Sequence, residues 1–306
     1  MMQEPIEYRN TEPSPAAVAS RGRVRSQITA HIKILRIRHW IKNLLLFAAP
    51  FFGGKLFLDK TALLAVPVFL AFSCCASAAY IFNDIKDCKK DRLHPLKKNR
   101  PVASNGISIP QASFFAVSLL IPSLALSYFI QPVFFYLLLS YIAIQAAYSL
   151  RLKDIAVVDI FCIASGFVIR VLAGGAAFSV VVSPWLLLSM FMISLVLGAG
   201  KRLSETGLLH EHAVTHRKSL EVSYVSSLQE ILLISSAASL IAYALYTVEM
   251  YPSLVYTIPV ATFGLFRYLI LSKQGLGDPT EALTKDKWLA MTVAMWLLLV
   301  GFIRYN

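Results

Sequence analysis

Three aspartates recur at helical spacing in the segment NDIKDCKKDRLHPLKKNRP. If this segment is helical up to Pro95, which ends a helix, then Asp84, Asp87 and Asp91 occupy positions i, i+3 and i+7 on one face. Carboxylates this close repel one another unless a hard cation lies between them, and Mg²⁺ prefers such oxygens together with phosphate oxygens. The spacing therefore predicts a Mg²⁺ site in which Asn83 supplies a further oxygen.

Cationic side chains follow this cluster directly. Arg92 comes directly after Asp91, and Lys97 and Arg100 follow a few residues later. Lysine and arginine form short charge-assisted hydrogen bonds with phosphate oxygens, so we expect these three residues to bind phosphate. A solvated helix end with mixed charges is the alternative. Because the carboxylates share one helix face and a basic turn follows them, a metal–diphosphate site is favoured over a solvated helix end.

A second group of polar residues lies in the apolar segment after residue 154. Asp159, Gly166 and Arg170 fall on one face of a predicted helix. Ionisable residues inside a membrane segment mark functional sites, and glycine lets a neighbour approach closely. We predict that Asp159 is catalytic and that Arg170 binds substrate. A purely structural Asp–Arg pair between helices is the alternative.

The elements that must position these residues are membrane helices. The chain is 57% hydrophobic and 15% charged over 306 residues, whereas soluble domains average about 45–50% apolar. Residues 1–30 are polar and predicted to be a disordered tail, and residues 31–306 to be a single transmembrane catalytic domain whose first part, 31–42, is an interfacial amphipathic helix. A span needs about 20 residues. Nine apolar stretches are predicted spans: 43–58, 62–82, 112–130, 133–150, 155–177, 184–200, 228–248, 253–271 and 288–303.

The distribution of basic residues predicts the topology. With the N-terminus in the cytoplasm, 24 of the 29 lysines and arginines lie in cytoplasmic segments, as the positive-inside rule requires. The candidate site residues then lie on the cytoplasmic side of a cell membrane. We attribute the net charge of +12 to basic residues that orient the chain in the membrane and bind anionic substrates. Nucleic acid is excluded as a partner. The four cysteines, Cys74, Cys75, Cys88 and Cys162, have no metal-type spacing.

The motif N-D-x-x-D-x-x-x-D, followed by H-P and R-P, resembles the first aspartate-rich loop of the UbiA superfamily of intramembrane prenyltransferases. This resemblance implies an all-α fold with nine transmembrane helices around a central lipid-open cavity. It also implies that Asn83, Asp84, Asp87 and Asp91 bind Mg²⁺ and a donor diphosphate. Tyr148 and Lys153 are similar to the tyrosine–lysine motif beside the donor site, with a spacing one residue longer than usual.

The loop after the sixth predicted span departs from that pattern. Aromatic prenyltransferases of the superfamily carry a second aspartate motif there, whereas this chain has GAGKRLSE with Lys201, Arg202 and the single acid Glu205. The exchange favours direct anion binding over metal binding. We expect all three residues to bind a substrate that carries more phosphate than a prenyl diphosphate does.

One phosphoribosyl-transferring branch of the superfamily shares further segments along most of the chain. The shared segments are HWIKNLLLFAAP (39–50), QAAYSLRLK (145–153), VVDI (157–160), GKRxxE (200–205), RKSLE (217–221) and the charged turn at 285–287. The resemblance implies transfer of 5-phosphoribose from phosphoribosyl pyrophosphate (PRPP) to a polyprenyl phosphate, with release of diphosphate. The transition state would be oxocarbenium-like, with Asp91 or Asp159 as the stabilising carboxylate.

Two other functions remain open at this stage. An aromatic prenyltransferase would share the first aspartate loop and use a prenyl diphosphate donor. A lipid-phosphate transporter would need polar sites near mid-membrane in paired halves, and only Asp159 and Arg170 suggest them. Runs of small residues such as 76–79 allow helix packing within one chain or in a homo-oligomer.

Overall fold

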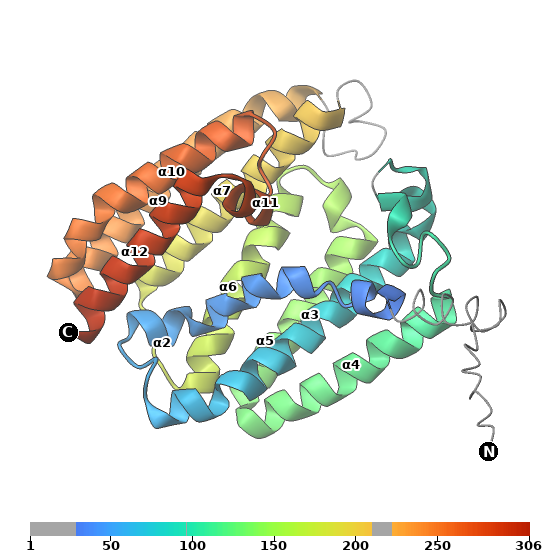
Figure 1. Ribbon diagram of the computed structural model, residues 1–306, viewed down its shortest axis with the longest axis horizontal. Helices are drawn as coiled ribbons and strands as arrows, with labels where there is room; N and C mark the ends of the chain where they lie inside the picture. The colour runs from blue at the N-terminus through green and yellow to red at the C-terminus, as the bar shows by residue number, and fades with distance from the viewer. Residues whose placement is uncertain (1–28, 96, 210–221) are drawn as a thin grey trace, which may run out of the picture.

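The computed structural model describes residues 29–95, 97–209 and 222–306, and this part of the chain is helical and contains no strand. The predicted tail and the RKSLE segment at 217–221 lie outside the described residues, except that residues 29 and 30 already belong to a helical turn. The long helices are α3 (Asp59–Leu93), α4 (Ile109–Ile130), α5 (Pro132–Leu150), α6 (Val158–Phe178), α7 (Pro184–Leu209), α9 (Val222–Met250), α10 (Ile258–Lys273) and α12 (Lys287–Tyr305) (Figure 1). The predicted all-α class is confirmed.

Short helices connect these elements. They are η1 (Ile37–Phe47), α2 (Ala48–Phe52), η2 (Lys97–Asn99), η3 (Leu152–Asp154), η6 (Pro252–Thr257) and α11 (Pro279–Lys285). Several helix starts follow from local sequence. Ser108 and Gln111 form a capping box at α4, and the Asp278 carboxylate accepts hydrogen bonds from the backbone N–H groups of Thr280 and Glu281 at the start of α11.

Eight helices in the described ranges are long and apolar enough to cross a membrane. The first predicted span, 43–58, is instead divided between η1 and α2, so the count of nine is not confirmed. Its chain turns at Gly53 and Gly54, and Gly54 has a left-handed backbone conformation with φ of 68°, which glycine adopts without steric cost. α3, in contrast, continues as one helix to Leu93, as the spacing of its aspartates predicted.

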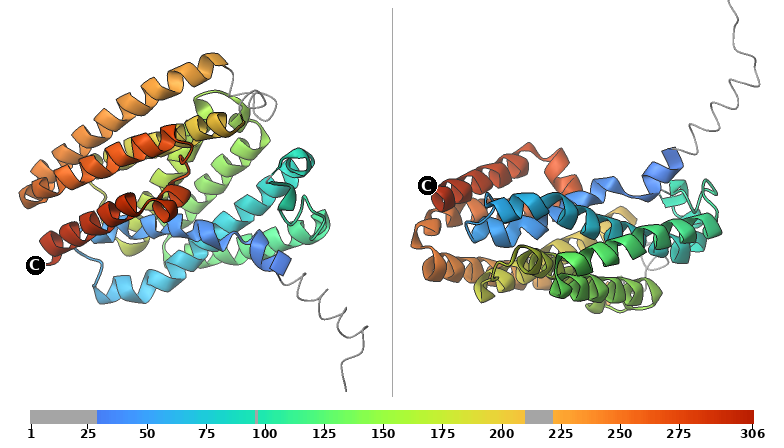
Figure 2. Two further views of the ribbon diagram at one scale, coloured as in Figure 1. Left: turned by 45° about the horizontal axis from the view of Figure 1, so that its top comes forward. Right: turned by 90° about the horizontal axis from the view of Figure 1, so that it is seen from below.

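The helices form two groups with α6 between them. α3, α4 and α5 pack together on one side, and α7, α9, α10 and α12 pack together on the other (Figures 1 and 2). η1 lies along α6, and α2 contacts α12, so a segment near the start of the described chain meets the last helix. A Cβ at Gly174 of α6 would lie 1.8 Å from the carbonyl oxygen of Leu46. The absence of a side chain at this position therefore sets how closely η1 approaches α6.

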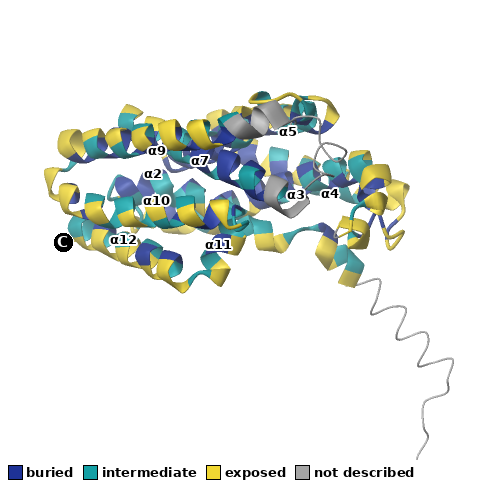
Figure 3. Ribbon diagram, turned by 90° about the horizontal axis from the view of Figure 1, so that it is seen from above, coloured by how far each residue is buried: buried dark blue, intermediate teal, exposed yellow. Residues whose placement is uncertain are grey.

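Apolar side chains cover the outside of the bundle as well as its core. Phe114 and Phe129 of α4 and Leu298 of α12 are 74%, 83% and 74% exposed, and exposed residues line the outer faces of the helices in Figure 3. A soluble protein rarely exposes such continuous apolar surface, whereas lipid accommodates it. The chain is a polytopic membrane protein.

Candidate active site

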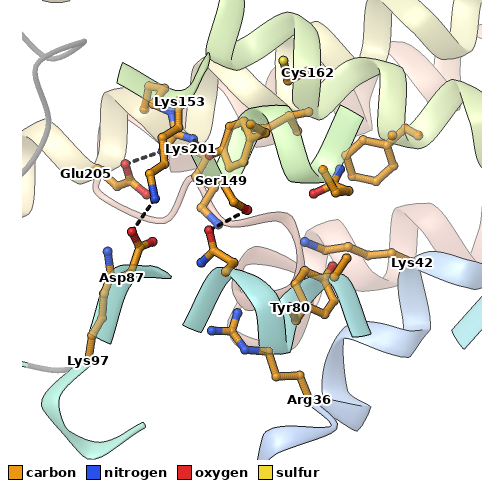
Figure 4. Close-up of a pocket in the computed structure, with 18 of the residues that line it drawn as sticks. Arg36, Lys42, Tyr80, Asp87, Lys97, Ser149, Lys153, Cys162, Lys201 and Glu205 are labelled. Carbon is orange, nitrogen blue, oxygen red and sulfur yellow. Dashed lines mark hydrogen bonds and ion pairs between the residues drawn. The ribbon is translucent and has the colours of Figure 1, made fainter. Parts of the chain in front are cut away.

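A cavity of about 440 Å³ opens between the two groups of helices. Nine lysines and arginines line it, against four carboxylates. The cations are Arg36, Lys42, Lys90, Lys97, Arg100, Lys153, Arg170, Lys201 and Arg202, and the acids are Asp87, Asp91, Asp154 and Glu205. Many of these side chains converge from different helices (Figure 4). The excess of positive charge makes the cavity a binding site for anions.

The acidic face of α3 is held by arginines from two other segments. Asp84 is buried and forms ion pairs with Arg36 and, at 3.2 Å, with Arg100. Arg100 also contacts Asp91 at 2.7 Å, so it bridges two acids separated by two helical turns. The geometry confirms that Asp84 and Asp91 share a helix face, and it shows how their mutual repulsion is offset.

The neighbouring edge of α3 faces α5 and the turn that follows it. Asp87 forms an ion pair with Lys153, which is buried in η3. The Oδ1 atom of Asn83 accepts a hydrogen bond from the Ser149 hydroxyl at 3.1 Å. Figure 4 shows this ion pair between Asp87 of α3 and Lys153. The structure thus brings together two motifs that are 66 residues apart in the chain.

Arg202 is the most enclosed cation of the site. Its side chain is 1% exposed, and its Nε donates at 2.7 Å to Asp159 of α6, which is fully buried. It also pairs with Glu205 and donates to the Tyr148 hydroxyl at 3.3 Å. Asp159 does not line the cavity and lies behind Arg202. Its contact is with the guanidinium, so Asp159 orients a cation that does face the cavity.

Arg170 has neutral partners within the described residues. It donates to the Asn43 side chain at 2.8 Å, the Gly166 carbonyl at 2.6 Å and the Tyr141 hydroxyl at 3.2 Å. Its guanidinium also lies 5.0 Å from the ring centre of Phe72, within the range of a cation–π contact. It does not pair with Asp159, because eleven residues of helix separate the two side chains by about 16 Å.

A short segment between α10 and α11 lies beside the cavity, behind Lys201. Gly277 packs on Gly200 so tightly that a Cβ at Gly277 would lie 2.0 Å from the Gly200 carbonyl oxygen. Next to it, Asp278 forms an ion pair with Lys201 at 3.2 Å. Burial raises the pKa of the Asp278 carboxyl, but Lys201 and Lys42 outweigh burial, so the pKa lies below its ordinary value.

Most of the predicted substrate-binding residues line the cavity. Arg92 does not. Its side chain bonds instead to the Ala103 carbonyl at 3.1 Å and to the Asn105 side chain at 2.6 Å, because it lies about 100° around the helix from Asp91. Sequence reasoning missed three cations of the cavity wall: Arg36, Lys42 and Lys90. The HWIKN segment held a signal for Lys42, since a lysine and an asparagine open an apolar run there.

The donor chemistry of α3 suits a hard divalent cation. The Oδ2 atom of Asp84 is buried and has no hydrogen-bond partner, and Asn83 and Asp87 reach the cavity one helical turn apart. Within the described ranges, no three His, Cys, Asp or Glu side chains cluster closely enough to hold a metal by themselves. Mg²⁺ is commonly bound by one or two carboxylates together with substrate phosphates, and two acids of α3 could provide such a site.

These features define a class: a polytopic helical membrane protein with an anion-binding cavity at one end of an acidic helix. Residues 45–283 match the UbiA prenyltransferase family, and the chain belongs to that family. It is 34% identical to the decaprenyl-phosphate phosphoribosyltransferase of Mycolicibacterium smegmatis, over 96% of this chain and 98% of that protein. The proteins of the same name from Mycobacterium tuberculosis and Corynebacterium glutamicum are 35% and 32% identical, over 88% and 90% of this chain and 92% and 86% of theirs.

Solved structures share the fold. A UbiA homologue from Archaeoglobus fulgidus bound to DMAPP and Mg²⁺ aligns with a TM-score of 0.67 at 21% identity, over 90% of this chain and 98% of that one. A digeranylgeranylglyceryl phosphate synthase aligns with a TM-score of 0.68 at 18% identity, over 91% and 99%. The predicted UbiA-like architecture is confirmed.

Proposed function

We propose that this protein transfers 5-phosphoribose from PRPP to a polyprenyl phosphate and releases diphosphate. The observation that carries the proposal is the charge of the cavity, where nine cations outnumber four carboxylates. PRPP carries a diphosphate and a 5-phosphate, and the acceptor lipid adds a third phosphate group. The relatives named decaprenyl-phosphate phosphoribosyltransferase, which match nearly the whole chain, support the same reaction.

The acidic end of α3 would hold the diphosphate of the donor. Asn83, Asp84 and Asp87 would bind Mg²⁺, which when bound neutralises charge that develops on the departing diphosphate. Lys153 and Arg100 already contact the acids of α3. They are therefore close enough to donate hydrogen bonds to the oxygens of a phosphate that binds beside those acids.

The reaction itself needs few catalytic groups. An oxygen of the lipid phosphate, anionic at neutral pH, attacks the anomeric carbon of ribose. The bond between that carbon and the diphosphate oxygen breaks, and diphosphate leaves with the electron pair. No proton has to move, so the protein needs no general base. Of the two carboxylates expected to stabilise positive charge on the ribose ring, Asp91 lines the cavity and Asp159 does not, so Asp91 would take this role. The surrounding helices would exclude bulk water.

The same proposal includes a location. Because the basic residues are concentrated on one side of the predicted spans, the positive-inside rule places the N-terminus and the site at the cytoplasmic face of a cell membrane. PRPP is a highly charged, water-soluble molecule, and its charges prevent it from crossing a lipid bilayer. A site that opens to the cytoplasm is therefore the one that such a donor reaches.

A transfer assay tests the function. Purified protein in lipid nanodiscs is incubated with Mg²⁺ and PRPP labelled in the ribose, with and without polyprenyl phosphate. We expect label to enter the organic phase only when both Mg²⁺ and the lipid are present, and EDTA to abolish the transfer. Turnover only with a prenyl diphosphate and an aromatic acid would refute the proposal in favour of an aromatic prenyltransferase.

A further inference from the structure

Among the described cavity cations that are not exposed to solvent, Lys42 and Arg170 have no acidic partner. Lys42 makes no ion pair and no hydrogen bond with any described residue, and Arg170 donates only to neutral groups among the described residues. Arg36, Arg100, Lys153, Lys201 and Arg202, in contrast, each contact a carboxylate. Positive charge enclosed among helices is costly unless an anion compensates it. The unbalanced charge at Lys42 and Arg170 therefore calls for an anionic ligand.

Lys42 and Arg170 occupy a different part of the cavity from the acidic face of α3. In Figure 4, Lys42 extends from η1 beside Tyr80, while Asp87 and Lys153 meet at the opposite side. The groups close enough to act on the Lys42 ammonium are Tyr80, Lys201, Asp278 and Arg170. Asp278 is the acid among them, and it is bonded to Lys201.

Arg170 is held in a fixed orientation and keeps donors to spare. The Asn43 side chain joins it to α3, since Asn43 accepts from Arg170 and donates to the Ser73 hydroxyl at 2.9 Å. Three of the five N–H donors of the guanidinium are used by Asn43, Gly166 and Tyr141. Two donors remain for a ligand in the cavity.

The surroundings of this pair are apolar on the side away from α3. Cys162, Ile163, Phe167 and Leu197 contribute to the cavity wall. η1 itself presents apolar side chains to the outside, where Ile37, Ile41 and Leu44 are 47%, 51% and 55% exposed. A ligand whose phosphate meets Lys42 thus has apolar surface both inside the cavity and along the outer face of the same helix, which suits a phosphate attached to an isoprenoid chain.

We infer that Lys42 and Arg170 form a second anion subsite, which binds the phosphomonoester of the acceptor lipid while the α3 end holds the donor diphosphate. This inference rests on the proposed function and adds to it the residues that select the acceptor. The 5-phosphate of PRPP has the same chemistry as the lipid phosphate, so the test separates the two sources. Lys42 contacts the substrate in this account, and Asn43 is a positioning residue that fixes Arg170.

The test compares Lys42→Met, Lys42→Arg and the control Lys33→Met in nanodiscs. Methionine keeps the length of the side chain and removes the charge, and Lys33 is exposed on the same segment outside the cavity. We expect Lys42→Met to raise KM for polyprenyl phosphate roughly 10- to 100-fold, the size of one lost charge-assisted contact, with the Kd of Mg²⁺–PRPP unchanged. Lys42→Arg should retain most of the affinity, and Lys33→Met should match the wild type.

Direct titration separates failure of the subsite from failure of the proposed function. Farnesyl phosphate, with farnesol as the uncharged control, is titrated against wild type and Lys42→Met. If Lys42→Met binds farnesyl phosphate more weakly than the wild type does, while farnesol binds equally to both, the subsite is supported even if no phosphoribosyl transfer occurs. Equal affinity in both proteins overturns it, and so does a Lys42→Met variant in which the Kd of PRPP rises while lipid binding is unchanged. Thermal unfolding in detergent checks that each variant is folded.

Discussion

Replacement of Asp159 by asparagine should destabilise the fold by removing the charge that compensates Arg202. The substitution is nearly isosteric, and the two side chains are 0% and 1% exposed. Breaking a buried ion pair by neutralising one partner costs about 3–5 kcal/mol. Glu205 and the Tyr148 hydroxyl still contact the guanidinium, so we expect a loss below this range, about 2–3 kcal/mol.

Equilibrium unfolding in mixed micelles measures this loss. Arg202→Gln alone should also destabilise, because Asp159 would then be a buried charge without its cation. The double variant should be less destabilised than the sum of the two single variants, with a coupling energy of about 1–3 kcal/mol. Glu281→Gln, which breaks the exposed pair with Lys285, is the matched control, and surface pairs contribute at most about 1 kcal/mol.

Two outcomes would refute this reasoning. One is an Asp159→Asn variant as stable as Glu281→Gln. The other is strict additivity of Asp159→Asn and Arg202→Gln, which would mean that the contact contributes nothing. An active and stable Asp159→Asn variant would also remove Asp159 from both the catalytic role that its sequence position predicted and the positioning role that its contact with Arg202 supports.

Three further predictions concern the rest of the cavity. Asp87→Asn should abolish phosphoribosyl transfer with little change in unfolding temperature, whereas Glu205→Gln should cost less, because Glu205 lies away from the proposed metal ligands; initial rates and thermal melts check both. Asp278→Asn keeps the helix cap but removes the charge that faces Lys201. Since the folded-state pKa of Asp278 is lowered, its contribution to stability should be constant above about pH 5 and disappear as the pH falls below about 4, which unfolding measurements at several pH values detect. Gly277→Ala should destabilise by about 1–3 kcal/mol, as overpacked sites do, and should reduce transfer.

Each of these predictions has an outcome that contradicts it. Measurable transfer by Asp87→Asn at ordinary Mg²⁺ concentration would remove this acid from the metal site. A stability difference between wild type and Asp278→Asn that grows as the pH falls would reverse the sign of the proposed linkage. For Gly277→Ala the control is Gly301→Ala in α12, whose new methyl group would meet only ordinary contacts at 3.8 Å. Equal stability of these two alanine variants would exclude a close packing constraint at Gly277.

Helical periodicity predicted much of the site because its main acids lie on one continuous helix. The spacing of Asp84, Asp87 and Asp91, with Pro95 after them, was sufficient to place three carboxylates at the end of α3. Which cation meets which acid was not predictable, since ion pairs join segments far apart in the sequence. Asp159 and Arg170 share a helix face, yet Asp159 pairs with Arg202 of α7 because helix packing, rather than position along one helix, decides the partner.

The first apolar stretch shows where sequence reasoning failed for a physical reason. An interfacial amphipathic helix over residues 31–42, followed by a regular span, was expected. The 3₁₀ geometry of η1 changes the angle between successive residues from 100° to about 120°, so side-chain directions inferred from an α-helix do not hold. Lys42 of η1 consequently lines the cavity. Arg36, which directly precedes η1 and has a left-handed backbone conformation, lines it as well. A pattern based on the period of 3.6 residues cannot detect such a rotation.

Because Gly174 packs closely on Leu46, a substitution at position 174 can change the position of Lys42, a residue that Gly174 does not contact. A methyl group at position 174 would meet the Leu46 carbonyl at 1.8 Å, and the easiest relief is an outward shift of η1. Lys42 lies one helical turn before Leu46, so it would move with that backbone. Random mutagenesis for altered acceptor preference should therefore recover variants at position 174, near the end of α6 and outside the cavity lining, as readily as variants in the cavity wall.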